Sequence, residues 1–255
     1  ISYLNVSVDL KRVFWELKLM DYYKKADGIL KKQMKINCIN KDDYDELNVN
    51  IKNNQSQYFE MQILKTNEGK IGKFRDSRKI SIGLCNKDIR YGKKKKTGAF
   101  YNCFVLILRI QMKNKFHEVH MKVFNTGKLE IPGIKDDAVL KKALELLVNL
   151  LQPFTKQPII YDLNRIETVL INSNFNCGYF IKRHELYSLL KSKYNINVIY
   201  DPCSYPGIQC TYFHNDFNDG ICHCSRQCSK KIKYGCKRIS FMIFRTGSAL
   251  IVGHC

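Results

Sequence analysis

The sequence is poor in the features that mark several common classes of protein. It holds 23 acidic residues against 43 lysines and arginines, five prolines and one tryptophan among 255 residues. No apolar run reaches the length of a membrane-spanning helix, and the first residues do not resemble a signal peptide. A P-loop and the G-x-S-x-G and H-E-x-x-H motifs are absent. We therefore expect no enzyme, no small-molecule substrate and no membrane association.

The shortage of acidic residues leaves a formal net charge of +20 and a sequence pI of about 9.5. Such an excess favours a polyanionic partner, because cationic side chains release the counterions condensed on it. Nucleic acid is the first candidate. A generally lysine-rich and asparagine-rich proteome would give the same composition without such a partner.

The eleven cysteines are odd in number and scattered, which is typical of reduced thiols in a compartment other than the secretory pathway. Four of them, Cys222, Cys224, Cys228 and Cys236, lie at short spacings in a basic segment. Four thiolates can close a tetrahedral zinc site, and a metal would stabilise a polar segment that lacks its own core. The alternative is four ordinary thiols in a solvated loop.

One phrase occurs twice in the chain. It reads FNTGKLEIPG from Phe124 and FRTGSALIVG from Phe244, with Phe, Thr and both glycines at identical spacing. Each copy follows an alternating run, so each predicts a β-hairpin with a tight turn at Thr-Gly. A repeat with two copies favours a duplicated domain over a solenoid.

The alternation also places the repeated aromatic side chain. In the first copy, Val119 and Val123 share the face that is expected to be core, and Phe124 shares the opposite, polar face. Phe244 has the same position in the second copy. A single such Phe would be read as an edge residue packed under a loop, but its recurrence makes a functional pair an equal alternative.

Around the two hairpins the sequence predicts further elements. Asp9 is expected to cap a short helix, and Asp136 or Asp137 a long apolar helix that ends at Leu151. Further predicted elements are strands over 103–110, 163–174, 195–200 and 208–213 and a helix over 182–193. Two repeats follow, 1–152 with an insertion at about 21–98, and 153–255 with a cysteine-rich insertion at about 214–238 and a final helix absent.

This order of elements resembles the TATA-box-binding protein family over roughly 170 residues in two blocks. Residues 200–208, YDPCSYPGI, are similar to the family's Tyr-Glu-Pro-x-x-Phe-Pro-Gly-Leu stretch, and 239–253 resembles its final hairpin. The insertions and the cysteine cluster look most like divergent versions encoded by large DNA viruses.

The resemblance implies an α+β fold in which two antiparallel halves form one curved saddle, with helices on the convex face. The concave face would lie in the DNA minor groove, with aromatic wedges that kink the duplex. By position, the implied DNA-binding residues are Phe124, Phe244, Tyr205, Arg109, Lys122, Thr126, Lys128, Lys135, Asn172, Met242, Thr246, Ser248, Leu250 and Val252. The first half departs from the family's apolar floor at His120, Lys122, Glu130 and Pro132.

The expected function is that of a viral general transcription initiation factor that bends A·T-rich promoter DNA and recruits other initiation factors and RNA polymerase. It would act in a viral factory in the host cytoplasm or in the host nucleus, with packaging in the virion left open. The alternative is a virion-packaged structural or protein-interaction module that keeps the saddle fold without TATA-specific DNA reading.

Overall fold

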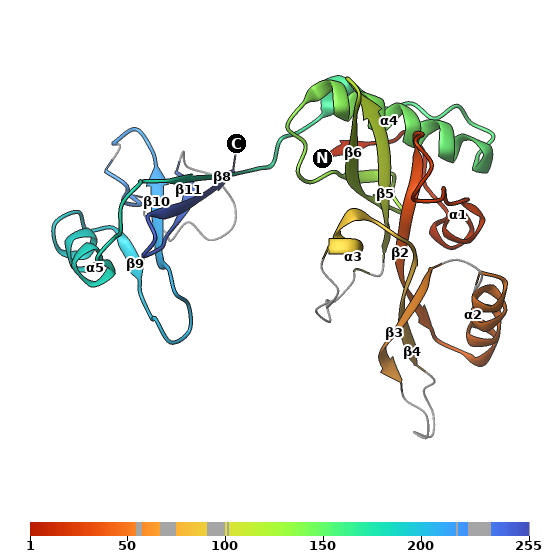
Figure 1. Ribbon diagram of the computed structural model, residues 1–255, viewed down its shortest axis with the longest axis horizontal. Coiled ribbons are helices and arrows are strands. Elements are labelled where there is room, and N and C mark those ends of the chain that lie inside the picture. Colours follow the sequence, from red (N-terminus) through yellow and green to blue (C-terminus); the bar gives the residue numbers. More distant parts are fainter. Residues whose placement is uncertain are drawn as a thin grey trace. The chain divides into compact units, whose positions relative to one another are not determined.

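The computed structural model describes residues 1–54, 58–66, 75–90, 100, 102–217, 219–223 and 236–254. The chain divides into two compact units, Ile1–Glu167 and Thr168–Cys255. Each unit contains an antiparallel sheet and α-helices (Figure 1), so the expected α+β class is confirmed. The division falls after Glu167, fifteen residues beyond the boundary that the sequence suggested.

The first unit is a seven-stranded sheet in the order β1-β7-β6-β5-β2-β4-β3. The strands are β1 (Ser2–Tyr3), β2 (Gly28–Cys38), β3 (Phe59–Thr66), β4 (Asp76–Gly83), β5 (Cys103–Met112), β6 (Lys115–Phe124) and β7 (Lys128–Glu130). The helices are α1 (Leu10–Glu16), α2 (Lys41–Asn53), α3 (Asn86–Arg90) and α4 (Asp137–Leu151). Short 3₁₀ turns, η1 (Gln152–Phe154) and η2 (Leu163–Arg165), follow α4.

The core of the first unit lies between one face of the sheet and three helices. Figure 1 shows α1, α2 and α4 on the same side of β2 and β5. Alternate residues of β5 point into this core, and Phe104, Leu106 and Leu108 are fully buried. Leu144 and Leu147 of α4 are equally buried, because apolar residues at helical spacing form one stripe.

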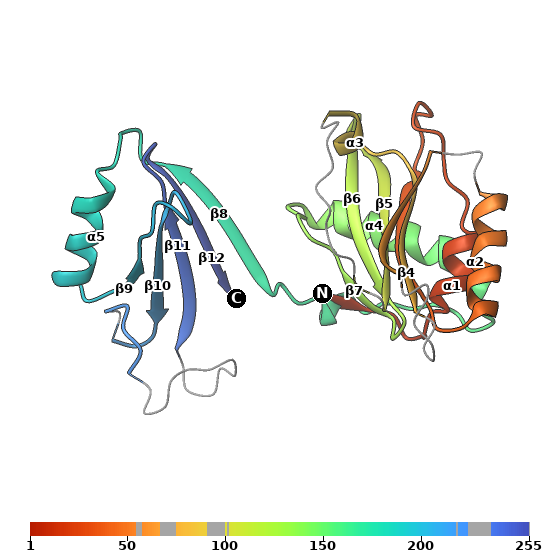
Figure 2. The ribbon, with the colours of Figure 1, turned by 90° about the horizontal axis from the view of Figure 1, so that it is seen from below.

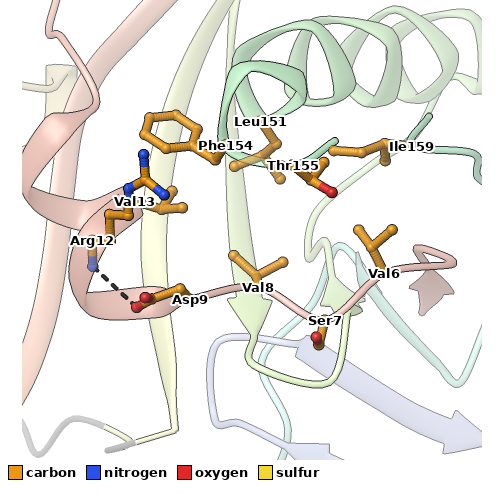
Figure 3. A pocket seen from close by; sticks show the side chains of 10 residues that line it. All are labelled: Val6, Ser7, Val8, Asp9, Arg12, Val13, Leu151, Phe154, Thr155 and Ile159. Atoms are coloured by element: carbon orange, nitrogen blue, oxygen red, sulfur yellow. Dashed lines mark hydrogen bonds between the residues drawn. The ribbon is translucent and has the colours of Figure 1, made fainter. Parts of the chain in front are cut away.

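Both predicted helix starts are confirmed. The Asp9 carboxylate accepts a hydrogen bond from the Arg12 amide at 3.2 Å, and the Asp136 carboxylate accepts one from the Ala138 amide at 2.9 Å. Each carboxylate satisfies an amide that the first turn of a helix leaves unpaired. A small pocket is lined by residues of α1 and α4 and of the segments next to them (Figure 3). Its volume is about 40 Å³, room for a water molecule or two.

The segment 21–98 is more than the decoration that the sequence suggested. Strand β2 pairs with β5 on one side and with β4 on the other, in the interior of the sheet. Its residues Ile29, Met34 and Ile36 belong to the core. The sequence analysis did not predict this strand as part of the sheet, because polar residues alternate with the apolar ones. The two faces of the strand have different surroundings.

Lys32 of β2 is buried among apolar residues, with 2% of its surface exposed. Its Nζ atom donates to the carbonyl oxygens of Trp15 at 3.2 Å and Leu17 at 2.8 Å, and lies 5.3 Å from the centre of the Phe14 ring. These carbonyls end α1, so the lysine satisfies acceptors that the last turn of a helix leaves unpaired. Burial lowers the pKa of Lys32 to about 8.

This lysine predicts a pH-dependent stability. Between pH 8 and about 10.5 the unfolded chain holds a proton on Lys32 that the folded chain has lost, so the unfolding free energy rises with pH over this window, by at most about 3 kcal/mol. The Lys32→Met variant lacks this contribution. Urea unfolding at pH 7.5 and 10.5 gives the unfolding free energy of both proteins. The wild-type value minus the variant value should be more positive at pH 10.5 than at pH 7.5. A difference that does not change with pH would contradict the prediction.

The second unit is a five-stranded sheet in the order β8-β12-β11-β10-β9. Its elements are β8 (Leu170–Asn176), α5 (Arg183–Ser192), β9 (Asn197–Ile199), β10 (Ile208–His214), β11 (Lys237–Ile243) and β12 (Ser248–His254). Figure 2 shows α5 beside the edge strand β9. The predicted strand over 163–174 begins later, at Leu170, since Leu163–Arg165 forms a 3₁₀ turn.

The two predicted hairpins are confirmed, and their turns have the same geometry. Gly127 and Gly247 have φ angles of 80° and 81°, which residues with a side chain rarely adopt. The amide of each glycine donates to the carbonyl of the preceding Phe, Phe124 or Phe244, at 3.0 Å. An added Cβ would lie 2.4 Å from a backbone oxygen at Gly127 and 2.3 Å from one at Gly247. Both the φ angle and the lack of space therefore require glycine at each position.

Candidate nucleic-acid interface

The Phe244 face is the side of the second sheet that carries Phe244, and it includes the exposed Arg238 near the start of β11. Cross-strand pairs define it: Ser240 is opposite Val252 and Met242 opposite Leu250, while Asn172 and Asn174 lie opposite Val252 and Leu250 on the other flank. Gln209 and Thr211 extend the same face on β10. Asn172 and Asn174 are exposed. The face thus combines apolar side chains with amide and hydroxyl donors.

Two aromatic rings stand together at one end of this face. The ring centres of Tyr205 and Phe244 are 5.9 Å apart, and the ring planes are inclined by 58°. The Tyr205 hydroxyl donates to the Met242 sulfur at 3.7 Å, which holds the ring against the face. Gly207 lies beneath both rings, and a Cβ there would approach Tyr205 to 3.0 Å and Phe244 to 3.1 Å. Tyr205 and Phe244 thus form a close aromatic pair.

The hairpin turn beside this pair is tied to β8. The Asn176 amide donates to the Thr246 carbonyl at 3.3 Å and to the Ser248 hydroxyl at 3.1 Å. Thr246 in turn donates to the Ser248 hydroxyl at 3.2 Å. These bonds connect strands distant in sequence, and they fix the turn that positions Phe244.

The equivalent Phe124 face of the first unit is charged. Glu130 pairs with Lys122 at 3.2 Å and with Lys128 at 3.0 Å, and the Lys128 ammonium lies 5.3 Å from the Phe124 ring centre. Burial alone would raise the pKa of Glu130, but the two lysines outweigh it and the pKa is lowered. The Glu130 carboxylate is therefore ionised. On its own it would repel a DNA phosphate, but the two neighbouring lysines balance its charge.

Helix α3 lies over the other end of the Phe124 face. Lys31 and Asp88 form an ion pair at 2.8 Å, with side chains only 6% and 10% exposed. The Glu118 carboxylate accepts from the Asn86 amide at 3.1 Å and 3.0 Å. Figure 1 shows α3 on the side of β2 and β5 opposite to α1 and α2. The chain itself thus covers part of this face.

Arg109 is placed differently from its predicted role as a contact to the DNA backbone. It is 7% exposed, its guanidinium donates to the carbonyls of Tyr22 at 2.6 Å and Lys24 at 2.9 Å, and it stacks on Tyr22 at 4.5 Å. This contact pattern holds a loop onto the sheet. The predicted contacts Lys135, Thr126 and Thr246 are exposed, so these three remain accessible.

Among the described residues of the first unit, a cysteine stands at the position that corresponds by sequence to Tyr205 in the second unit's pair. Cys103 is the residue opposite Phe124, and it is 3% exposed. Phe100 lies nearby, since the Lys122 ammonium is 4.9 Å from its ring centre, and it is 61% exposed. The two faces therefore differ in charge, in coverage and in their aromatic residues.

The predicted zinc ligands are described in part. Cys236 is buried and accepts from the Asn215 amide at 3.5 Å, while Cys222 is half-buried. Cys224 and Cys228 lie outside the described residues. Within the described ranges no group of three or more potential metal ligands is found, and a four-cysteine site stays a prediction.

Sequence reasoning missed α3 and a basic pocket beside the aromatic pair. The pocket is lined by Phe180, Ile181, Lys182, Arg183, His184, Tyr200 and Arg245. Consecutive Lys182, Arg183 and His184 were a signal for it, whereas nothing local marks Asp88 as the partner of Lys31. Among the described residues, no helix combines the length and apolarity needed to cross a membrane.

Comparison with known proteins gives a distant relative whose description names the TATA-box-binding protein family, the family that the sequence resembles. A protein of Acanthamoeba polyphaga mimivirus, described as TATA-box-binding protein-like, is 25% identical over 175 residues, which cover 63% of this chain. The match covers 45% of that relative, so the chain spans less than half the length of the curated protein it matches. No family model matches the sequence.

Proposed function

We propose that the protein binds double-stranded DNA in the minor groove and bends it, as a viral initiation factor of the TATA-box-binding type. The observation that carries the proposal is the Phe244 face, a sheet surface of apolar, amide and hydroxyl side chains that ends in the Tyr205–Phe244 pair. The distant similarity to a viral TATA-box-binding protein-like protein supports it. Recruitment of other initiation factors and RNA polymerase belongs to the same proposal.

The chemistry of the face fits the floor of the minor groove. That floor presents acceptors, adenine N3 and thymine O2, between apolar base edges, and guanine adds a donor. The Asn172 and Asn174 amides and the Ser240 hydroxyl supply donors beside Val252 and Leu250. A surface of this kind favours A·T pairs, while the net charge of +20 supplies attraction to phosphate that carries no sequence information.

A second candidate function has its own supporting observation. Helix α3 covers part of the Phe124 face through the buried Lys31–Asp88 pair. A face occupied by its own chain would contribute less to a duplex, which favours a structural or protein-interaction module that keeps the fold without TATA reading. The two functions differ in whether DNA is bent and in whether A·T pairs are preferred.

The deciding experiment is a mobility-shift titration on matched A·T-rich and G·C-rich duplexes at several salt concentrations. Energy transfer between dyes at the duplex ends reports bending in the same samples. The proposed function predicts tighter binding to the A·T-rich duplex and a bend in the complex. Equal affinity without a bend would contradict the proposed function and favour the second candidate.

Zinc binding is a separate proposal for Cys222, Cys224, Cys228 and Cys236. Metal analysis of the purified protein should give about one zinc per chain, lost on chelation, because four thiolates complete a tetrahedral site. Replacing Cys222 and Cys228 by serine should abolish binding, whereas Cys177→Ser, a cysteine far from the cluster in sequence, should not. Absence of stoichiometric zinc would leave four ordinary thiols.

A further inference from the structure

The basic pocket at the start of α5 is open to solvent and lies in the second unit. Its seven lining residues include Lys182, Arg183 and Arg245, and none of the seven is acidic. Because it is open, it can receive one group of a large molecule. Its charge selects for an anion.

Aromatic rings lie against both arginines, and within the described part of the chain neither is paired with a carboxylate. The Arg183 guanidinium lies 5.3 Å from the centre of the Tyr200 ring, and that of Arg245 lies 5.9 Å from the Phe180 ring. His184 packs edge-on against Tyr200 at 5.1 Å. Stacking of this kind orients a guanidinium and leaves its charge available to an anion.

Lys182 does have an acidic neighbour, but the pair is weak. Its ammonium lies 3.0 Å from Glu185, and the two side chains are 78% and 70% exposed. Exposed pairs of this type contribute little and are screened by salt. The positive character of the pocket therefore persists, since among the described residues neither Arg183 nor Arg245 forms an ion pair.

The pocket is bonded to the two loops that carry the aromatic pair. Arg183 donates to the carbonyl of Pro206, the residue after Tyr205. Arg245 follows Phe244 directly, and its carbonyl accepts from the Ile181 amide at 2.9 Å. The two arginines are therefore connected directly to the segments that position Tyr205 and Phe244.

We infer that this pocket binds a backbone phosphate of the duplex, just outside the base step that Tyr205 and Phe244 unstack. The inference rests on the proposed function. A kink brings the flanking phosphates toward the protein, and arginine binds phosphate with paired, charge-assisted hydrogen bonds. Continuity with the Phe244 face and the overall excess of cations favour DNA over an acidic protein as the source of the anion.

Charge-removing substitutions test the inference. The double variant Arg183→Gln/Arg245→Gln should bind A·T-rich and G·C-rich duplexes more weakly by the same factor, on the order of tenfold at 0.15 M salt. The slope of log affinity against log salt should become less steep by about 2, one unit for each lost contact. The bend, measured by energy transfer at saturation, should remain.

Two further variants test whether the effect comes from a loosened loop or from the loss of any positive charge on α5. Lys182→Gln/Arg245→Gln keeps the Arg183 bond to the Pro206 carbonyl, so it tests the charge without loosening that loop. Lys191→Gln removes a cation that lies over Tyr187 at 5.5 Å, about 12 Å further along α5, and should change neither affinity nor slope. Thermal unfolding of each variant confirms that the fold is intact.

The outcomes separate this inference from the proposed function. Wild-type binding and bending with an unchanged salt slope in both double variants would overturn the phosphate site and leave the proposed function standing. A wild-type protein that does not bind duplex DNA would overturn both. A loss of binding confined to A·T-rich duplexes would also overturn the inference, because a phosphate contact carries no sequence preference.

Discussion

Replacing Tyr205 and Phe244 together by alanine is expected to abolish bending and to weaken duplex binding by on the order of 100-fold. Each ring is available to stack on an exposed base, and such stacking contributes about 1–3 kcal/mol per base. The rings are 5.9 Å apart over Gly207, so they act at one base step. Energy transfer across an end-labelled A·T-rich duplex measures the bend, and mobility shift measures the affinity.

A matched control is available on the opposite face of the same sheet. Phe175 of β8 is 53% exposed and lies on the side away from Phe244, so Phe175→Ala removes a similar ring without touching the Phe244 face. It should leave both bending and affinity unchanged. The variant Phe124→Ala should have a smaller effect than Phe244→Ala, because Phe124 lies opposite Cys103 and beside Lys128 instead of a second ring. Bending that persists in Phe124→Ala/Phe244→Ala would show that neither ring is a wedge.

Together with the pocket variants, the wedge variants separate two expected effects in the second unit, DNA bending and the salt dependence of binding. The aromatic pair is expected to control the bend, and the pocket arginines the salt dependence. A variant that loses the bend while it keeps the full salt slope, together with one that shows the reverse, would assign the two effects to neighbouring but separate groups. Loss of both effects in every variant would instead indicate a folding defect.

What the sequence predicted well was local. The hairpin turns follow from Gly127 and Gly247, whose positive φ leaves glycine as the residue without strain. The start of α4 follows from Asp136, because a short acidic side chain can bond the first free amides. The face on which Phe244 lies followed from the two-residue period of a strand, and Tyr205, which contacts both Met242 and Phe244, is consistent with it.

What the sequence did not predict depends on contacts between distant segments. Lys31 and Asp88 are 57 residues apart, and neither has a neighbour that indicates burial. Arg109 was assigned to DNA from its position alone, whereas the carbonyls of Tyr22 and Lys24 occupy its guanidinium. Charged residues are expected from sequence to be exposed. Cations that bond the backbone of a loop, as Arg109 does, or of a helix end, as Lys32 does, are therefore misplaced by pattern alone.

The buried pair that holds α3 is the other site of large expected effects. Removing one charge of a buried pair leaves the second uncompensated, which typically costs about 3–5 kcal/mol. Asp88→Asn should fall in this range, since the Lys31 side chain is only 6% exposed. Burial raises the pKa of Asp88, but the hydrogen bonds from Lys31 and Cys85 outweigh it and hold the pKa well below its usual range.

The double variant Lys31→Met/Asp88→Asn should recover much of that loss, because it removes the uncompensated charge together with its former partner. The coupling energy from the four unfolding free energies should therefore exceed about 1 kcal/mol. Urea unfolding followed by fluorescence of Trp15, the single tryptophan, reports on the first unit, since its side chain packs against that core. A control cycle on Arg12 and Glu16, a pair with side chains 57% and 53% exposed, should give well below 1 kcal/mol. Additive losses at Lys31 and Asp88 would mean that α3 is not held by this pair.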